Sequence, residues 1–187
     1  MEEFIHYIKT YCHLTDEIIE DLKKASKIDH YKKNTTIIPK GIFCKQLYFL
    51  VKGTVRSYFY YKDKEITHWI YTHHHFFTAW HSYIFNQSTE ELYETTEDSI
   101  LVSISYEKWE VLYKKHPILE RSMRMISQQD LAMLDHFYKG YYFLSAKEKY
   151  DLLLHYYPDI TQRANLGHIA SMLGVSQETL SRIRGKK

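Results

Sequence analysis

The stretch of this chain that most constrains its fold is the carboxyl-terminal run LGHIASMLGVSQETLSRIR, residues 166–184. Its apolar residues follow helical spacing in two short runs, Ile169, Ala170 and Leu173, then Leu180 and Ile183. Between the runs, Gly174 is typical of the left-handed residue that ends a helix, and Ser176 is typical of a residue that caps the next one. The spacing therefore predicts a helix over 166–173, a tight turn and a second helix.

The outward side of the second helix is then polar, formed by Gln177, Glu178, Ser181, Arg182 and Arg184. Glutamine pairs with adenine, glutamate accepts from the cytosine amine, and arginine pairs with guanine or holds phosphate. We therefore expect Gln177, Glu178 and Arg182 to read bases in a DNA major groove. Phosphate or other contacts are expected from Arg163, Ser176, Thr179, Ser181, Arg184, Lys186 and Lys187. The alternative is an ordinary helical hairpin with a polar face.

Length, composition and charge fit a well-packed domain with a small second one. The chain has 187 residues, 44% of them hydrophobic, and a net charge of +2, with the basic excess in the part after residue 140. No run of about 18 apolar residues and no signal peptide stand out, so we expect a cytoplasmic protein. Cys12 and Cys44 form no CxxC motif, and we expect buried thiols rather than a disulfide or an iron–sulfur site.

The middle of the chain changes to the period-two pattern of β-strands. An opening helix is expected before it, with Thr15 or Asp16 as its cap and apolar residues at Ile18, Ile19 and Leu22. Runs rich in β-branched and aromatic residues then predict strands over 47–51, 54–61, 66–73 and 99–105. Turn residues at 52–53 and 62–64 separate the first three strands. A small antiparallel roll or barrel is the natural closure of such strands.

Helical spacing returns after residue 105. A short helix should end before Pro117, where a long helix begins and runs to about residue 140. The apolar stripe of this helix, broken at Asp130, consists of Leu119, Met123, Ile126, Met133 and Phe137. Its steps of three and four are those of a coiled-coil seam and predict a homodimer, the alternative being that the stripe packs on its own chain. Ser145 should cap a further helix, and residues 160–163 are expected to form a strand.

In this order of elements the chain resembles the CRP/FNR family of bacterial transcription regulators. The resemblance covers nearly the whole chain and includes Gly41, LYFLVKGTVR at 47–56 and ISY at 104–106. Its most specific part is carboxyl-terminal: Pro158-Asp159, Ile169-Ala170, Leu173-Gly174-Val175-Ser176, Glu178-Thr179 and Arg182. In family members, residues at the positions of Gln177, Glu178 and Arg182 contact base edges.

The resemblance implies an α+β fold with three parts. These are an antiparallel, jelly-roll-like β-roll sensor domain of the cyclic nucleotide-binding type at 1–116, a dimerisation helix at 117–140, and a small helix–turn–helix DNA-binding domain at 141–187. The chain ends three residues after Arg184, so we expect this domain to lack the C-terminal wing of the family. The implied function is that of a homodimer on double-stranded DNA, with RNA polymerase as a further partner and no enzyme activity.

The same resemblance bears on the effector. Members that bind cyclic nucleotides use a Gly-Glu pair and an Arg-Ser pair, and the matching positions here are Thr78-Ala79 and Thr89-Glu90. We therefore expect no binding of cyclic AMP by the usual contacts, and no cofactor. An effector pocket is predicted around Trp69, Thr78, Ala79, Trp80, Thr89 and Glu90, in an aromatic segment that suits a planar apolar molecule. The simpler interpretation is that these aromatic residues fill the core.

Two other functions are compatible with the sequence. His73 and His75 alternate on one predicted strand, with His68 and His81 nearby, so a metal- or haem-binding roll that acts through protein contacts is one alternative. A cupin-like metalloenzyme is more distant, because no further ligand stands at a recognisable spacing and no phosphate-loop or nucleophile motif occurs.

Overall fold

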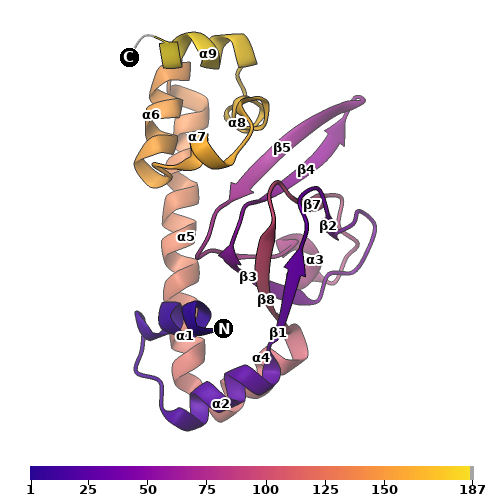
Figure 1. Cartoon of the computed structure of the whole chain (residues 1–187), viewed down its shortest axis with the longest axis vertical. Coiled ribbons are helices and arrows are strands. Elements are labelled where there is room, and N and C mark those ends of the chain that lie inside the picture. Colours follow the sequence, from indigo (N-terminus) through magenta and orange to yellow (C-terminus); the bar gives the residue numbers. More distant parts are fainter. Residues whose placement is uncertain (186–187) are drawn as a thin grey trace.

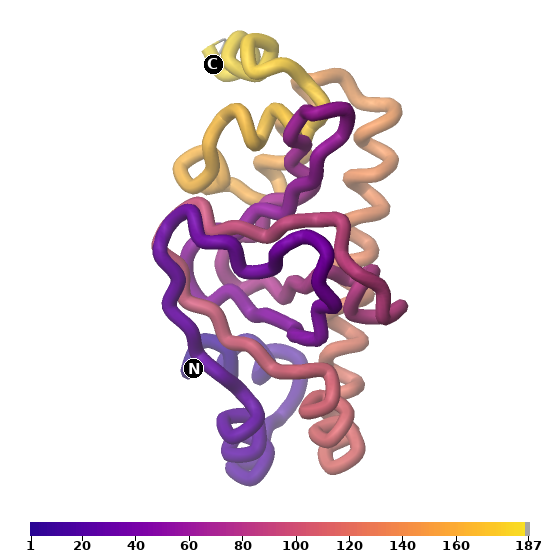
Figure 2. Tube along the Cα trace, turned by 90° about the vertical axis from the view of Figure 1, so that its right-hand side faces the viewer, coloured from indigo at the N-terminus to yellow at the C-terminus, as the bar shows by residue number. Residues whose placement is uncertain are grey.

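The computed structural model describes residues 1–185, so Lys186 and Lys187, which we expect to contact DNA, lie outside the described residues. Two four-stranded antiparallel sheets form an open roll, and one long helix runs beside it (Figure 1). A group of short helices lies beyond the roll at the far end of that helix (Figure 2). Within residues 1–185, no helix has the length and apolar character needed to cross a membrane.

The two sheets have the strand orders β1-β8-β3-β6 and β2-β7-β4-β5. The strands are β1 (Lys27–Tyr31), β2 (Thr36–Ile38), β3 (Gln46–Lys52), β4 (Val55–Tyr61), β5 (Lys64–Tyr71), β6 (Phe76–Phe77), β7 (Leu92–Thr95) and β8 (Ser99–Ser105). The helices are α1 (Glu2–Lys9), α2 (Asp16–Ala25), α3 (Trp80–Phe85), α4 (Tyr106–Lys115), α5 (Pro117–Phe143), α6 (Ala146–Tyr156), α7 (Ile160–Arg163), α8 (Leu166–Leu173) and α9 (Gln177–Gly185). The four predicted strands are confirmed as β3, β4, β5 and β8.

Aromatic side chains fill the interior of the roll. Phe77 is fully buried, and the centre of its ring lies 5.3 Å from that of Tyr48 and 5.1 Å from that of Tyr71. Tyr93 stacks on the same ring at 6.0 Å, and its hydroxyl donates to the carbonyl oxygen of Thr78 at 2.9 Å. These contacts favour the interpretation that the aromatic residues of this region form a core.

The long helix α5 buries its first half against its own chain. Leu119, Met123 and Ile126 join a core with α1, α2 and α4, and none of the three is more than 8% exposed. Further along, Met133 and Phe137 are half-buried against the core of the short helices. The first half of the predicted seam is thus covered within the chain, and its second half is partly covered, as in the alternative that the stripe packs on its own chain.

Charged groups tie α2 to the junction of α4 and α5. Asp21 accepts a hydrogen bond from Nζ of Lys115 at 2.6 Å and lies 2.8 Å from Nε2 of His116. These two contacts lower the pKa of Asp21 from its ordinary 3.8 to about 2. A carboxyl whose pKa is lowered by folding stabilises the fold above its unfolded-state pKa, and this contribution is lost as the pH falls through the folded-state pKa.

We therefore expect Asp21→Asn to lower the urea midpoint of unfolding by a constant amount above a pH of about 4, and by a vanishing amount as the pH falls to about 2. Urea titrations at several pH values measure this difference. Glu20→Gln is the matched control, because Glu20 is exposed and pairs with Lys23 one turn along the same helix. A difference that grows towards acidic pH would contradict the role of Asp21.

Candidate nucleic-acid interface

Two short helices near the carboxyl-terminal end form the predicted helix–turn–helix. α8 ends at Gly174, whose φ of 66° is left-handed and whose amide donates to the carbonyl oxygen of Ser171 at 3.1 Å. Ser176 caps α9, since its Oγ accepts from the amide of Thr179 at 3.1 Å. The bounds of α8, the start of α9 and the turn between them are thus as the sequence predicted.

Apolar inner faces hold the two helices together. Ile169, Leu173 and Leu180 are at most 4% exposed and pack with Leu153 of α6. Ile183, which we expected on the same side, is half-buried. α6, α7, α8 and α9 therefore share one small core that fixes which side of α9 faces outward.

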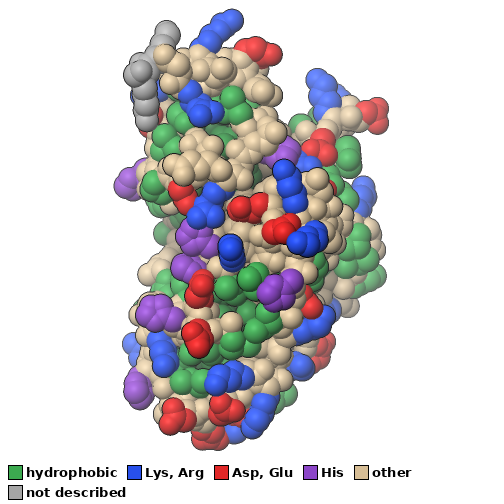
Figure 3. All heavy atoms as spheres, viewed as in Figure 1, with side chains coloured by type: hydrophobic (Ala, Val, Ile, Leu, Met, Phe, Trp, Pro, Cys, Tyr) green, Lys and Arg blue, Asp and Glu red, His purple; other side chains and the backbone are tan. Residues whose placement is uncertain are grey.

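The outer face of α9 is polar and open. Its exposed side chains are the predicted set, Gln177, Glu178, Ser181, Arg182 and Arg184. Figure 3 shows basic and acidic side chains projecting side by side at the end of the molecule where α9 lies. Hydrogen bonds from the backbone and from Ser176 lower the pKa of Glu178, with a further contribution from the charge of Arg182. Glu178 is therefore ionised at neutral pH and can only accept hydrogen bonds.

The side chain of Gln177 lies beside the first turn of α8. A Cβ atom on Gly167 would stand 3.1 Å from Oε1 of Gln177 and 3.3 Å from Oδ1 of Asn165. Asn165 caps α8, because its Oδ1 accepts from the amide of Gly167 at 2.8 Å. Because Gly167 has no side chain, the side-chain amides of Asn165 and Gln177, at the starts of α8 and α9, both have room beside it. No sequence signal singled out Asn165 or Gly167.

Arg163, expected to hold phosphate, is engaged within the chain. Residues 160–163 form the helix α7 and not the expected strand, because backbone amides in this segment bond to carbonyl groups three or four residues earlier. The Arg163 guanidinium pairs with Asp159 and lies 3.7 Å from Glu97 of the roll. This pairing holds the pKa of Asp159 below its usual range. A phosphate would have to compete with both carboxylates for Arg163.

The helix–turn–helix touches the hairpin formed by β4 and β5. The backbone amide of Thr67 in β5 donates to Oγ of Ser171 in α8 at 3.0 Å. Two residues further along β5, the ring of Trp69 packs edge-on against Phe137 of α5 at 5.1 Å and against Tyr157 at 6.3 Å. The roll is thus joined to the carboxyl-terminal helices by this hairpin as well as by α5.

A charge cluster centred on a buried arginine lies near this contact. Arg56 of β4 is only 5% exposed, and its guanidinium pairs with Glu65 at 2.5 Å and with Glu94 at 3.4 Å. Burial, and then the charge of Arg56, lower the pKa of His168 in α8. Because the ordinary pKa of histidine is about 6.5, His168 is neutral at pH 7. The helix–turn–helix therefore meets the roll without adding a further charge to the cluster.

No family model and no curated protein matches this sequence. Solved structures do match it. The c-di-GMP-responsive global regulator CLP of Xanthomonas campestris has a TM-score of 0.69 and 18% identity, covering 92% of this chain and 91% of that chain. FixK2 of Bradyrhizobium japonicum has a TM-score of 0.70 and 16% identity, covering 86% and 83%. A candidate transcriptional regulator of the CRP/FNR family from Eubacterium rectale has a TM-score of 0.67 and 16% identity, covering 92% and 82%. The chain has the CRP/FNR fold.

Within this CRP/FNR fold, the six residues of the predicted effector pocket differ in burial and in their partners. Three of them are buried in the roll, Thr78, Ala79 and Thr89. Glu90 is exposed and pairs with Lys40 at 2.8 Å. Trp69 and Trp80 line a common groove between β5 and α5. Of the six residues, only Trp69 and Trp80 line this groove. The sequence could not show this, because residue spacing does not reveal which side of a strand faces α5.

Two of the histidines considered as metal ligands, His68 and His75, have separate partners in the CRP/FNR fold. Nδ1 of His68 lies 2.6 Å from Glu91, and Nδ1 of His75 lies 3.3 Å from the carbonyl oxygen of Thr72. Within residues 1–185, the side chains close enough to form a group of three candidate ligands are Glu17, Asp21 and His116. Lys115 already pairs with both of these carboxylates, at 2.8 Å and 2.6 Å.

Proposed function

We propose that this chain is a DNA-binding transcription regulator of the CRP/FNR type that acts as a homodimer. The observation that carries the proposal is the outer face of α9, where polar side chains stand exposed on a helix whose other side is buried. The likeness to solved regulators of the same fold supports it. A cytoplasmic location and contact with RNA polymerase belong to the same proposal.

In this mechanism the first turns of α9 enter the major groove. Gln177 offers an amide that pairs with adenine, and the ionised Glu178 accepts from the amino group of cytosine. One turn further, Arg182 presents a guanidinium that fits the O6 and N7 atoms of guanine. These three side chains would supply the direct readout of the sequence.

Contacts to phosphate would come from the groups around these reading residues. The side chains concerned are Ser176, Thr179, Ser181 and Arg184, together with Lys186 and Lys187. Arg163 would contribute only after leaving its carboxylate partners. Such contacts fix the register of the protein on DNA and carry no direct sequence information.

A homodimer would use the face of α5 that its own chain leaves open. Large side chains line this face and are between 45% and 66% exposed: Leu131, Leu134, Tyr138, Tyr141 and Tyr142. Leu131, Leu134, Tyr138 and Tyr141 recur at steps of three and four residues, the spacing at which paired helices interdigitate. Twofold pairing along this face would present two copies of α9 to successive major grooves, about 34 Å apart.

Cyclic AMP would not act through the contacts usual in the family. At the matching positions a cyclic phosphate would meet the carboxylates of Glu90 and Glu91 in place of a guanidinium, and like charges repel. The rings of Phe77 and Tyr93 also fill the interior of the roll. Any effector would therefore be held by other contacts.

The test is fluorescence anisotropy of the protein on a pool of duplexes from its own upstream region, across a salt series. We expect selective binding, and we expect Arg182→Ala to cost about 1–3 kcal/mol on the selected site while relaxing the preference at one base pair. Arg184→Ala is the matched comparison, because loss of a phosphate contact weakens all duplexes alike and reduces the salt slope by about one. Equal losses on selected and random DNA for Arg182→Ala would contradict base readout by this residue.

A further inference from the structure

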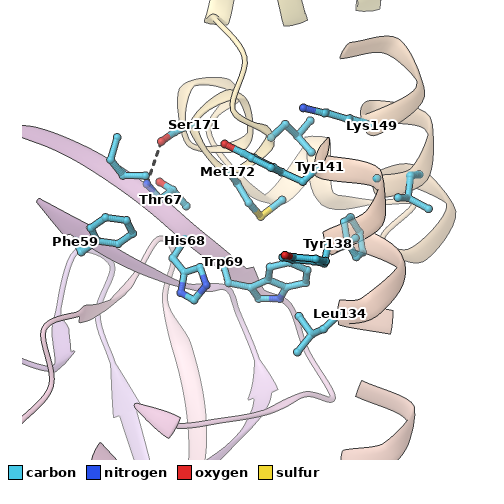
Figure 4. Close-up of a pocket in the computed structure, with 15 residues that line it drawn as sticks. Phe59, Thr67, His68, Trp69, Leu134, Tyr138, Tyr141, Lys149, Ser171 and Met172 are labelled. Carbon is cyan, nitrogen blue, oxygen red and sulfur yellow. Dashed lines mark hydrogen bonds between the residues drawn. The ribbon is translucent and has the colours of Figure 1, made fainter. Parts of the chain in front are cut away.

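A hollow of about 420 Å³ lies where the roll, the long helix and the helix–turn–helix meet (Figure 4). Its walls include Phe59 and Trp69 from the hairpin, Tyr138 and Tyr141 from α5, and Met172 from α8. Small-molecule sites are typically hollows of about 300–1,000 Å³ with mostly apolar and aromatic walls and a few polar groups. This hollow has that size and that composition.

We infer that this hollow, and not the interior of the roll, binds the effector of this protein, and that the effector is a planar aromatic molecule with an acidic group. The inference concerns a second site, distinct from the DNA-reading face of α9. Within the roll itself, Phe77 lies among the rings of Tyr48, Tyr71 and Tyr93. A separate groove of about 400 Å³ lies between β5 and α5 and, among residues 1–185, has no lysine or arginine in its walls.

The walls account for the planar aromatic part of the ligand. In Figure 4 the rings of Trp69 and Tyr138 and the thioether of Met172 surround the same space. Aromatic rings gain from stacked or edge-on contact with one another, and methionine sulfur makes favourable contacts with ring edges. A flat ring system between these walls makes both kinds of contact.

The acidic group follows from the charge at the rim. Nζ of Lys149 lies 4.5 Å from the centre of the Tyr141 ring, beside the hollow. The other basic wall group, His68, is already bonded to Glu91 at 2.6 Å. Lys149 is therefore the wall cation most available to a ligand anion, with which a charge-assisted hydrogen bond is stronger than a neutral one.

A second copy of the chain fits this hollow poorly. A single turn of helix, about 10 Å wide and about 5.4 Å long, would already fill such a volume. In the proposed homodimer the partner's helix would lie along the exposed face of α5, which includes the wall residues Tyr138 and Tyr141. It would bound the mouth of the hollow and leave the space between Trp69 and Met172 to a smaller molecule.

The position of the hollow couples it to α8. The hydrogen bond from Thr67 to Ser171 runs along its wall and joins the roll to the helix–turn–helix (Figure 4). A ligand that contacts both β5 and α8 would stabilise the arrangement in which these two elements are bonded. It would thereby shift the equilibrium between the orientations that α9 can adopt relative to the roll.

The test uses the whole chain without DNA and two dyes with related ring systems, anilinonaphthalene sulfonate, which carries an anion, and phenylnaphthylamine, which does not. Wild-type protein should bind both. Met172→Glu should weaken sulfonate binding at least tenfold, and Lys149→Gln should weaken it about threefold or more without affecting phenylnaphthylamine. Phe59→Ala, on the opposite wall, should weaken both dyes and provides a second variant if Met172→Glu misfolds.

Phe85→Ser is the control, because Phe85 is 64% exposed on α3 and lies outside the walls of the hollow. It should leave both affinities unchanged. The inference is overturned if neither wall variant changes dye binding, if Phe85→Ser abolishes it, or if the dyes bind only at dilutions where the protein is monomeric. Since no DNA is present, these results are independent of the Arg182→Ala experiment that tests DNA recognition.

Discussion

Replacing Gly53 with alanine should lower the free energy of unfolding by about 3–5 kcal/mol, and the melting temperature by roughly 10 °C. Gly53 joins β3 to β4 with a φ of 104°, a conformation that residues with a side chain rarely adopt. A Cβ atom there would also stand 2.8 Å from Cα and 2.6 Å from Cβ of Ser99, at the start of β8. Strain and steric overlap therefore add, and calorimetry measures their sum.

Gly41→Ala separates the two causes. Gly41 also has a positive φ, 87°, but a Cβ atom there would meet nothing within 4 Å. Its replacement should cost only the backbone strain, about 1–2 kcal/mol. Adding Ser99→Gly to Gly53→Ala should restore part of the loss, because it removes the side-chain overlap and leaves the close backbone. Equal losses at Gly41 and Gly53 would show that the approach of Ser99 does not matter.

The double variant Leu134→Glu, Tyr138→Glu should convert the proposed homodimer to a monomer of 22.6 kDa and weaken binding to a two-half-site duplex about 100-fold or more. Both residues lie on the exposed face of α5, where a twofold pairing would bring like charges together. In a dimer, binding of one subunit to its half-site holds the other subunit close to the second half-site. A monomer loses this high effective concentration, so its affinity for the duplex is lower. Light scattering after size exclusion and anisotropy on DNA measure the two effects.

Val111→Glu is the matched control for this variant. Val111 is 65% exposed on α4, so the substitution adds a carboxylate at an open apolar position away from the proposed interface. Mass and DNA binding should not change. The α5 face would be excluded as the interface if the double variant remained dimeric. A monomeric variant that kept full affinity would instead separate dimerisation from DNA binding.

The helix–turn–helix was predictable because its signals are local. Gly174 and Ser176 mark the turn through their own backbone preferences, and the inward positions of Ile169 and Leu180 follow from helical period alone. The outward face of α9, and hence the candidate reading residues, follow from the same period. The ion pairs of Arg163 were not predictable, because one of its partners, Glu97, belongs to the roll and is distant in the sequence.

The missed elements are short or carry weak patterns. β1 is an edge strand without a buried residue, and β6 comprises Phe76 and Phe77 alone, so neither shows the alternation that marks a strand. The apolar stripe of α5 was recognised, but a helical period does not say whether the covering surface belongs to the same chain or to a second copy. Leu119 and Met123 face the roll, and the exposed stripe through Leu134 is a second one.

Because Leu119, Met123 and Ile126 are buried within the chain, folding of the protein should not depend on its concentration. A long helix anchored by its own roll does not need a second subunit to become ordered. In the proposed homodimer each protomer would therefore fold alone, and dilution should separate folded monomers before it unfolds them. The concentration of the protein in the cell would then set how often paired half-sites on DNA are occupied. It would not decide whether the chain stays folded.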